Sequence, residues 1–232
     1  MKPSMKKWIT VILLFVLLPL LIGLGIGLSG GKLYAFLYMA TAIIAMIPFF
    51  LSFEKGKADA RMMLLIAVMT ALSVLGRILF AVTPSFKPVT AMVILTALYF
   101  GREAGFLTGA LSALLSNLYF GQGPWTPFQM FTWGLIGFIA GVLAKPLKKS
   151  RIALLLYGGV AGAIFSLLMD FWSTLWESGS ADPTRFFAHF TAGLPVLAVI
   201  TLSNVIFLWV LAKPIGRILS RLQTKYGIGL AE

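Results

Sequence analysis

The chain has 232 residues, of which 59% are hydrophobic and only 11% are charged. Soluble domains are about 45–50% apolar and about 25% charged, so this composition excludes an ordinary soluble protein and indicates an integral membrane protein. The net charge of +12 does not indicate nucleic-acid binding, because the basic residues lie between apolar runs. There is no cysteine and the single histidine is His189, which excludes a disulfide framework, a thiol nucleophile and a multi-histidine metal site.

Eight apolar segments follow one another along the chain, and a bilayer-spanning helix needs about 20 residues. The first segment resembles a signal peptide, but it is longer than the usual apolar region and no small-residue cleavage site follows it, so we expect a retained helix. The fourth segment is too short to cross the bilayer without tilt, and we expect its flanks to extend it or the bundle to enclose it. The predicted helices cover residues 8–28, 33–53, 62–82, 89–100, 104–120, 126–143, 152–176 and 187–211.

The basic residues alternate between the two sides of these helices. With the N-terminus in the cytoplasm, most of the 19 basic residues fall in cytoplasmic segments, whereas the outer loops hold only Lys32, Lys87 and Arg185. Cytoplasmic loops of membrane proteins carry such an excess of Lys and Arg. The pattern therefore predicts an even number of helices with both termini cytoplasmic. It places residues 117–133 outside, together with the loops at residues 83–88 and 177–186.

Residues 117–133 form a stretch in which polar, aromatic, Gly and Pro residues crowd together without any ionisable side chain. Such a mixture suits a neutral or zwitterionic organic ligand better than an ion. The alternative is a turn at the membrane interface that carries an aromatic belt. The candidate ligand-binding residues of this stretch are Asn117, Tyr119, Gln122, Trp125, Gln129 and Trp133.

Two ionisable residues, Arg77 and Asp170, lie within apolar segments near the depth of this stretch. Charges inside a membrane are costly, at about 2.5–3.5 kcal/mol on insertion scales, and are often functional. The two residues could pair with each other or line a cavity, and Arg77 could instead extend to the interface. Lys87, in an outer turn, is either an anion contact or a solvated lysine, and Phe86 beside it is a further candidate ligand-binding residue.

Small residues recur at four-residue steps from Gly101 through Gly105, Gly109 and Ala113 to Asn117, which favours close helix packing. No phosphate-binding loop, carboxylate pair, serine elbow or row of acidic residues is present. We therefore predict no catalytic residue and no metal site, and any transport must draw its energy from another subunit.

Five runs stand out in the second part of the chain: residues 67–71 (AVMTA), 76–77 (GR), 84–91 (PSFKPVTA), 100–117 (FGREAGFLTGALSALLSN) and 120–141 (FGQGPWTPFQMFTWGLIGFIAG). Through these runs, the region from about residue 58 to the C-terminus resembles the substrate-binding S components of energy-coupling factor (ECF) vitamin transporters. Within that family, the runs are most similar to the branch assigned to cobalamin.

The resemblance implies an all-α membrane fold with a six-helix core over residues 58–213, preceded by two extra helices in residues 1–57 and followed by a basic cytoplasmic tail from residue 214. It implies a substrate pocket that opens outside, a membrane-embedded coupling subunit and two cytoplasmic ATPases as partners, and a prokaryotic plasma membrane as location. Ala67 and Ala71 match the small-residue contact for the coupling subunit. No resident cofactor is implied, because the vitamin is cargo, and we expect cobalamin or a related corrinoid.

Within that reading, Arg77 or Lys87 would meet the phosphate of the ligand, and the amides and tryptophans of residues 117–133 would meet its amides and apolar faces. Three alternatives remain open: an S component for riboflavin, a queuosine precursor or another vitamin; a membrane scaffold without ligand; and an intramembrane enzyme, which the missing catalytic groups disfavour.

Overall fold

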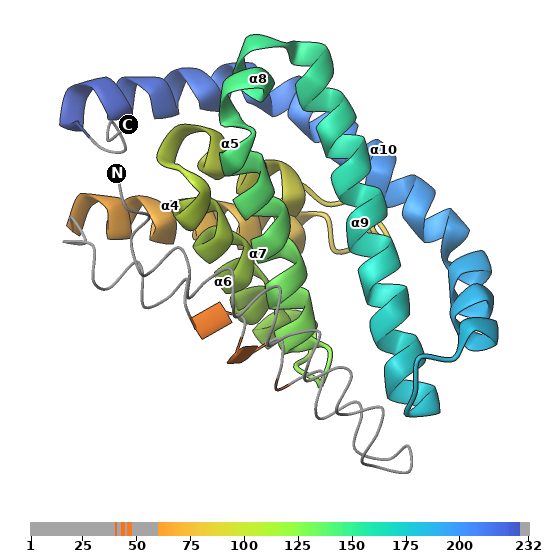
Figure 1. The fold of residues 1–232 in the computed structure, drawn as a ribbon. Helices are drawn as coiled ribbons and strands as arrows, with labels where there is room; N and C mark the ends of the chain where they lie inside the picture. Colours follow the sequence, from red (N-terminus) through yellow and green to blue (C-terminus); the bar gives the residue numbers. More distant parts are fainter. Residues whose placement is uncertain (1–39, 41–42, 45, 48–59, 228–232) are drawn as a thin grey trace, which may run out of the picture.

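The computed structural model describes residues 40, 43–44, 46–47 and 60–227, and every regular element in these residues is a helix. This confirms the all-α prediction for the described part of the chain. Most of the two predicted N-terminal helices, and the last five residues, lie outside it. The described helices are α4 (Ala60–Leu79), α5 (Val89–Phe100), α6 (Arg102–Phe120), α7 (Thr126–Val142), α8 (Ala144–Lys149), α9 (Arg151–Ser178) and α10 (Pro183–Tyr226) (Figure 1).

Helix ends follow local sequence signals. α5 and α6 are separated by Gly101 alone, whose φ of 91° suits a residue without a Cβ. α9 begins after Ser150, whose side chain accepts a hydrogen bond from the backbone N–H of Ala153, and α10 begins after Asp182, which caps Thr184 in the same way. These caps fix where two long helices start.

The bundle encloses α5. All of its residues except Tyr99 are buried, and it contacts each of the other described helices. The short apolar segment at residues 89–100 therefore sits inside the protein, where its length need not match the bilayer. Met46, from the segment that precedes α4, is 4% exposed and belongs to the same hydrophobic core.

The stripe of small residues packs α6 against α7. A Cβ built on Gly109 would lie 2.4 Å from the carbonyl oxygen of Trp133, and one built on Gly137 would lie 2.4 Å from that of Gly105. Only glycine permits this approach of the two backbones. Because Trp133 and Gln129 stand on α7, this contact sets their position relative to α6.

The C-terminal helix is longer than the apolar pattern predicts. α10 continues through Pro195 and Pro214 to Tyr226, so residues 214–226, which we expected to be a tail, are helical. The extension is amphipathic: Gly216 and Leu219 are buried, whereas the basic side chains are exposed. Packing of that apolar side stabilises the helix where Pro214 would otherwise favour its end.

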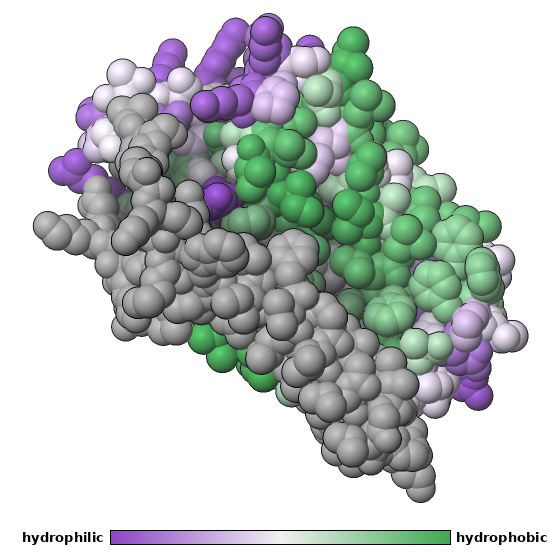
Figure 2. Space-filling model, in the orientation of Figure 1, coloured by the Kyte–Doolittle hydropathy of each residue, from purple (hydrophilic) through white to green (hydrophobic). Residues whose placement is uncertain are grey.

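Hydrophilic and hydrophobic surfaces separate along the bundle. Hydrophilic side chains gather at two opposite ends, and hydrophobic side chains cover the band between them (Figure 2). Among the described helices, α4, α9 and α10 are long and apolar enough to cross a membrane, and α5 and α7 are shorter apolar helices. The arrangement is that of a membrane protein whose two ends face water.

Candidate ligand-binding site

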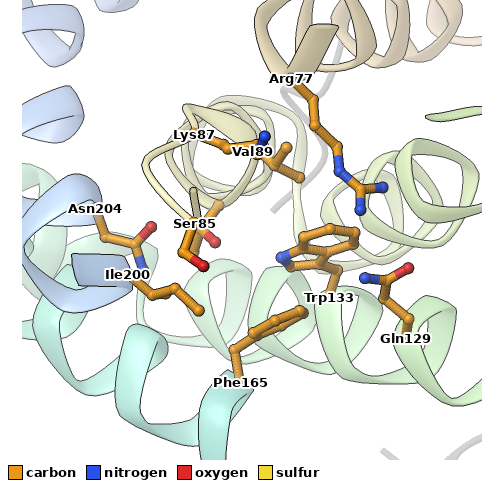
Figure 3. A pocket seen from close by; sticks show the side chains of 10 residues that line it. Arg77, Ser85, Lys87, Val89, Gln129, Trp133, Phe165, Ile200 and Asn204 are labelled. Carbon is orange, nitrogen blue, oxygen red and sulfur yellow. The ribbon is translucent and has the colours of Figure 1, made fainter. Parts of the chain in front are cut away.

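A cavity of about 160 Å³ lies near the ends of the helices that the charge pattern predicts to face outside. Five helices and the loop between α4 and α5 contribute to it, so its walls come from residues far apart in the sequence. The lining residues are Arg77, Ser85, Lys87, Val89, Thr90, Gln129, Trp133, Phe165, Ile200 and Asn204 (Figure 3).

Two stacked aromatic rings form one wall. The ring centroids of Trp133 on α7 and Phe165 on α9 are 4.8 Å apart, and the ring planes are inclined by 23°. Trp133 is 6% exposed and lies between Arg77 and Phe165 in Figure 3. A flat, rigid and apolar wall of this kind suits the face of a planar ligand.

A hydrogen-bond network joins three helices behind this wall. Nη1 of Arg77 donates to Oδ1 of Asn117 at 2.8 Å and to the hydroxyl of Ser116. Nδ2 of Asn117 in turn donates to Oε1 of Gln129 at 2.8 Å and to Oγ1 of Thr126 at 3.0 Å. Asn117 does not line the cavity itself, but it orients Arg77 and Gln129, which do.

Arg77 has no carboxylate partner among the described residues, where the ion pairs are Arg185–Asp182 and His189–Glu177. Its guanidinium carbon lies 4.6 Å from the ring centroid of Phe120 and 5.2 Å from that of Trp133. Rings and neutral amides stabilise the cation without cancelling its charge. The site thus keeps a positive charge that can receive an anionic group.

The loop before α5 brings a second cation to the same place. The hydroxyl of Ser203 on α10 accepts a hydrogen bond from the backbone N–H of Lys87 at 2.8 Å and donates one to its carbonyl oxygen at 3.1 Å. The ammonium group of Lys87 donates to the carbonyl oxygen of Phe80 at 3.1 Å. Burial and the positive charge of Arg77 lower the pKa of Lys87.

The loop also contains Ser85 in the left-handed region, with φ of 60°. Non-glycine residues in this region are uncommon and gather at ligand clamps and active sites. The rings of Phe80 and Phe86 pack against Phe207 of α10, with centroid distances of 5.1 and 5.0 Å. Phe86 thus anchors the loop and is not part of the cavity lining.

Asn204 completes the polar lining on the side opposite Arg77 (Figure 3). It is 1% exposed, and its Nδ2 donates to the carbonyl oxygen of Gly158 at 3.1 Å. This bond fixes the amide and leaves its carbonyl oxygen free to accept from a ligand.

The structure brings together four of the predicted binding residues, Arg77, Lys87, Gln129 and Trp133, with Asn117 directly behind them. The remaining candidates from the turn lie away from the cavity. Tyr119, Gln122 and Trp125 are exposed, and the side-chain amide of Gln122 donates to the carbonyl oxygen of Leu114 at 2.9 Å.

Asp170 also lies away from the cavity and does not pair with Arg77. A Cβ built on Gly193 of α10 would lie 3.1 Å from its Oδ2, which has no hydrogen-bond partner among the described residues. Of the two sequence interpretations, an Arg77–Asp170 pair is absent from the structure, and only Arg77 lines the cavity.

Sequence reasoning missed six lining residues: Ser85, Val89, Thr90, Phe165, Ile200 and Asn204. The sequence did offer a usable signal for Asn204, because an amide side chain in an apolar helix is costly unless it has hydrogen-bond partners. Phe165 and Ile200 had none, since apolar residues in apolar helices are indistinguishable without the fold.

The two alanines predicted to contact a coupling subunit, Ala67 and Ala71, lie on an exposed face of α4. Val68, Leu72 and Leu75 on the same helix are also exposed. Val68 and Leu72 also line an apolar groove of about 490 Å³ between α4 and the end of α10, so the described helices leave this side of α4 uncovered.

Residues 57–221 match the family model described as "ECF-type riboflavin transporter, S component". No curated protein and no solved structure matches the chain. The matched range covers well over half of the chain and contains every residue of the cavity. The chain therefore belongs to the ECF-type riboflavin transporter S-component family, and is a multi-pass membrane subunit that binds substrate for an ECF vitamin transporter.

Proposed function

We propose that this S component captures cobalamin or a related corrinoid from outside a prokaryotic plasma membrane and delivers it through a coupling subunit driven by two ATPases. One observation carries the choice of ligand: two cations, Arg77 and Lys87, line a cavity that also offers amides, hydroxyls, aromatic rings and aliphatic side chains. A cobalamin carries peripheral amides, a phosphodiester and a flat ring, and each of these groups has a counterpart here.

The roles of the lining residues follow from their chemistry. Arg77 and Lys87 bind the phosphodiester, because charge-assisted hydrogen bonds to phosphate are short and strong. Gln129 and Asn204 bind amides of the ligand. The Trp133–Phe165 wall packs against an apolar face.

The cavity is smaller than the ligand. Its volume of about 160 Å³ lies below the roughly 300–1,000 Å³ of usual small-molecule sites. We therefore propose that the phosphate-bearing arm of the corrinoid enters first, and that the outer turns at residues 80–88 and 121–125 move apart to admit the rest. The exposed Gln122 and Trp125 then contact the part of the ligand outside the cavity.

Riboflavin is the second candidate, because the matching family is named for it. Its isoalloxazine ring suits the Trp133–Phe165 wall. Riboflavin has no phosphate, however, so it gives the two cations no partner. The two ligands thus predict different consequences for the loss of charge at Arg77.

Equilibrium binding to the purified full-length protein in lipid nanodiscs separates the candidates. We expect cyanocobalamin to bind at micromolar concentration or below and riboflavin to compete poorly. Binding of riboflavin together with no binding of any cobalamin form would reassign the ligand. Binding of neither vitamin would favour another cargo or a scaffold role.

We further propose that the face of α4 with Ala67 and Ala71 contacts the coupling subunit. Small residues let two helices approach closely, and both alanines are exposed. The contact lies on α4, the helix that also carries Arg77, so a shift of α4 driven by the partner would disturb the cavity directly.

A further inference from the structure

Two further cavities lie at the opposite end of the bundle, which the charge pattern predicts to be cytoplasmic. One has about 620 Å³ and lies among the ends of α5, α6, α7 and α8. The other is a shallow, open depression of about 460 Å³ along α10. Tyr99 lines both, and its hydroxyl packs so closely on α10 that a Cβ built on Gly216 would lie 2.5 Å from it.

The walls of these two cavities are strongly basic. Arg102, Lys145 and Lys148 line the first, with Glu103 as its one acidic residue, and Lys213, Arg217 and Arg221 line the second. The last three residues are four apart, so they form one stripe along α10. A patch with six cations and one carboxylate attracts anions.

Aromatic rings hold some of these cations in place. The ammonium group of Lys148 lies 5.1 Å from the ring centroid of Tyr99, and the guanidinium carbon of Arg102 lies 5.5 Å from that of Phe138. The amide of Gln223 on α10 donates to the backbone carbonyl of Tyr99, which joins the last turns of α10 to α5. The two cavities are therefore parts of one packed structure.

The end of α10 combines these cations with exposed apolar residues. Ile218 is 57% exposed and Tyr226 is 40% exposed, on the same stretch as Arg217 and Arg221, and both line an apolar groove of about 490 Å³ between α10 and α4. Hydrophilic side chains gather at this end in Figure 2, next to the apolar band. An amphipathic helix of this composition lies at the boundary between headgroups and acyl chains.

We propose that the two cavities on either side of Tyr99 form a binding site for an anionic phospholipid of the inner leaflet. Its phosphate groups lie on Lys148 and Arg102 on one side and on Arg217 and Arg221 on the other. Basic pockets between membrane helices on the cytoplasmic side suit such headgroups. The presence of two basic cavities favours a headgroup with two phosphates, as in diphosphatidylglycerol.

The contribution of the basic side chains can be tested by comparing substitutions inside the two cavities with substitutions of nearby basic residues outside them. Lys148→Gln/Arg217→Gln removes one cation from each cavity, and Lys149→Gln/Lys225→Gln removes two cations from the same helices that line neither. Lys148→Arg/Arg217→Lys keeps both charges and shows whether the positions tolerate substitution.

The full chain is purified in a neutral detergent, and diphosphatidylglycerol binding is titrated by native mass spectrometry. A basic residue near an anionic surface contributes a factor of about five in affinity, so we expect a loss of about 25-fold in Lys148→Gln/Arg217→Gln. The control and charge-conserving variants should bind within about twofold of the unaltered protein. Equal binding by Lys148→Gln/Arg217→Gln and its control would overturn the proposal.

Two more outcomes would also overturn it. In phosphatidylcholine nanodiscs, thermal stabilisation by inorganic pyrophosphate without any by diphosphatidylglycerol would assign the cavities to a soluble diphosphate. If Lys148→Gln/Arg217→Gln loses transport with the complete transporter but retains lipid, the surface serves a protein partner.

Discussion

Arg77 on α4 and Asn117 on α6 are joined by a hydrogen bond of 2.8 Å from Nη1 to Oδ1, between residues 40 positions apart in the sequence. The amide nitrogen Nδ2 of Asn117 donates a hydrogen bond to Oε1 of Gln129 on α7. The buried side chain of Asn117 thus positions Arg77 and Gln129, which both line the cavity. A substitution at Asn117 should therefore alter ligand binding although Asn117 does not line the cavity itself.

Asn117→Leu should therefore lower both stability and ligand affinity. The substitution keeps a similar volume but leaves Oε1 of Gln129 without its donor, and an unsatisfied buried polar group costs about 1–3 kcal/mol. Thermal unfolding in nanodiscs measures the first effect and equilibrium binding the second. Thr224→Val, at an exposed hydroxyl of α10 that does not line the cavity, serves as the control. Equal unfolding temperatures for the two variants would contradict the role of the network.

The close contact between α6 and α7 predicts that two Gly→Ala substitutions differ in their effect on stability. Gly109→Ala places a Cβ against the backbone of Trp133, and overpacking of this kind costs about 1–3 kcal/mol. Gly159→Ala on α9 meets its nearest atoms at 3.6 Å, an ordinary contact, and should be tolerated. Thermal unfolding of both variants checks the order, and a Gly159→Ala protein less stable than Gly109→Ala would refute it.

Lys87 predicts a pH dependence of ligand binding. Its pKa is lowered by burial and by Arg77, so it loses its proton at a lower pH than an ordinary lysine does. A phosphate binds the protonated form better, so affinity should fall as pH rises through that lowered pKa. Dissociation constants measured from about pH 7 to about pH 10 test this. The decline should vanish in Lys87→Met, and the same decline in that variant would show that another group titrates.

Substitutions on the exposed face of α4 should stop transport without affecting ligand binding. Ala67→Trp and Ala71→Trp add bulk where the coupling subunit is proposed to dock, so uptake with the complete transporter should stop while the vitamin still binds. Val160→Trp, on an exposed position of α9, should leave uptake intact. Normal uptake in both alanine variants would remove the proposed contact from α4.

Much of the fold could be predicted because hydrophobic runs, glycines and prolines mark helix ends locally. The bounds of α5 came from Pro88 and Gly101 in this way. The extension of α10 beyond Pro214 could not be predicted, because the residues that stabilise it pack against helices distant in sequence.

The residues of the candidate site likewise divide into those that the sequence predicts and those that only the fold reveals. Arg77 and Lys87 are conspicuous in sequence because charge is rare and costly near apolar helices. Gln129 and Trp133 lie in an unusual polar and aromatic stretch, but that stretch alone did not show that Tyr119 and Trp125 point away from the cavity. Whether a residue near a turn faces inward depends on the helix packing, which is a tertiary property.

The proposed site binds a vitamin through an anionic group held by Arg77. Cobinamide lacks the nucleotide and phosphodiester of cobalamin, so the ratio of the two affinities measures that interaction. We expect the unaltered protein to prefer cobalamin by about 10-fold or more, as a charge-assisted hydrogen bond of about 1.5–3 kcal/mol implies. In Arg77→Gln this preference should largely vanish, whereas the exposed control Arg185→Gln should keep it. A preference that survives unchanged in Arg77→Gln, or affinity for riboflavin alone, would contradict the account.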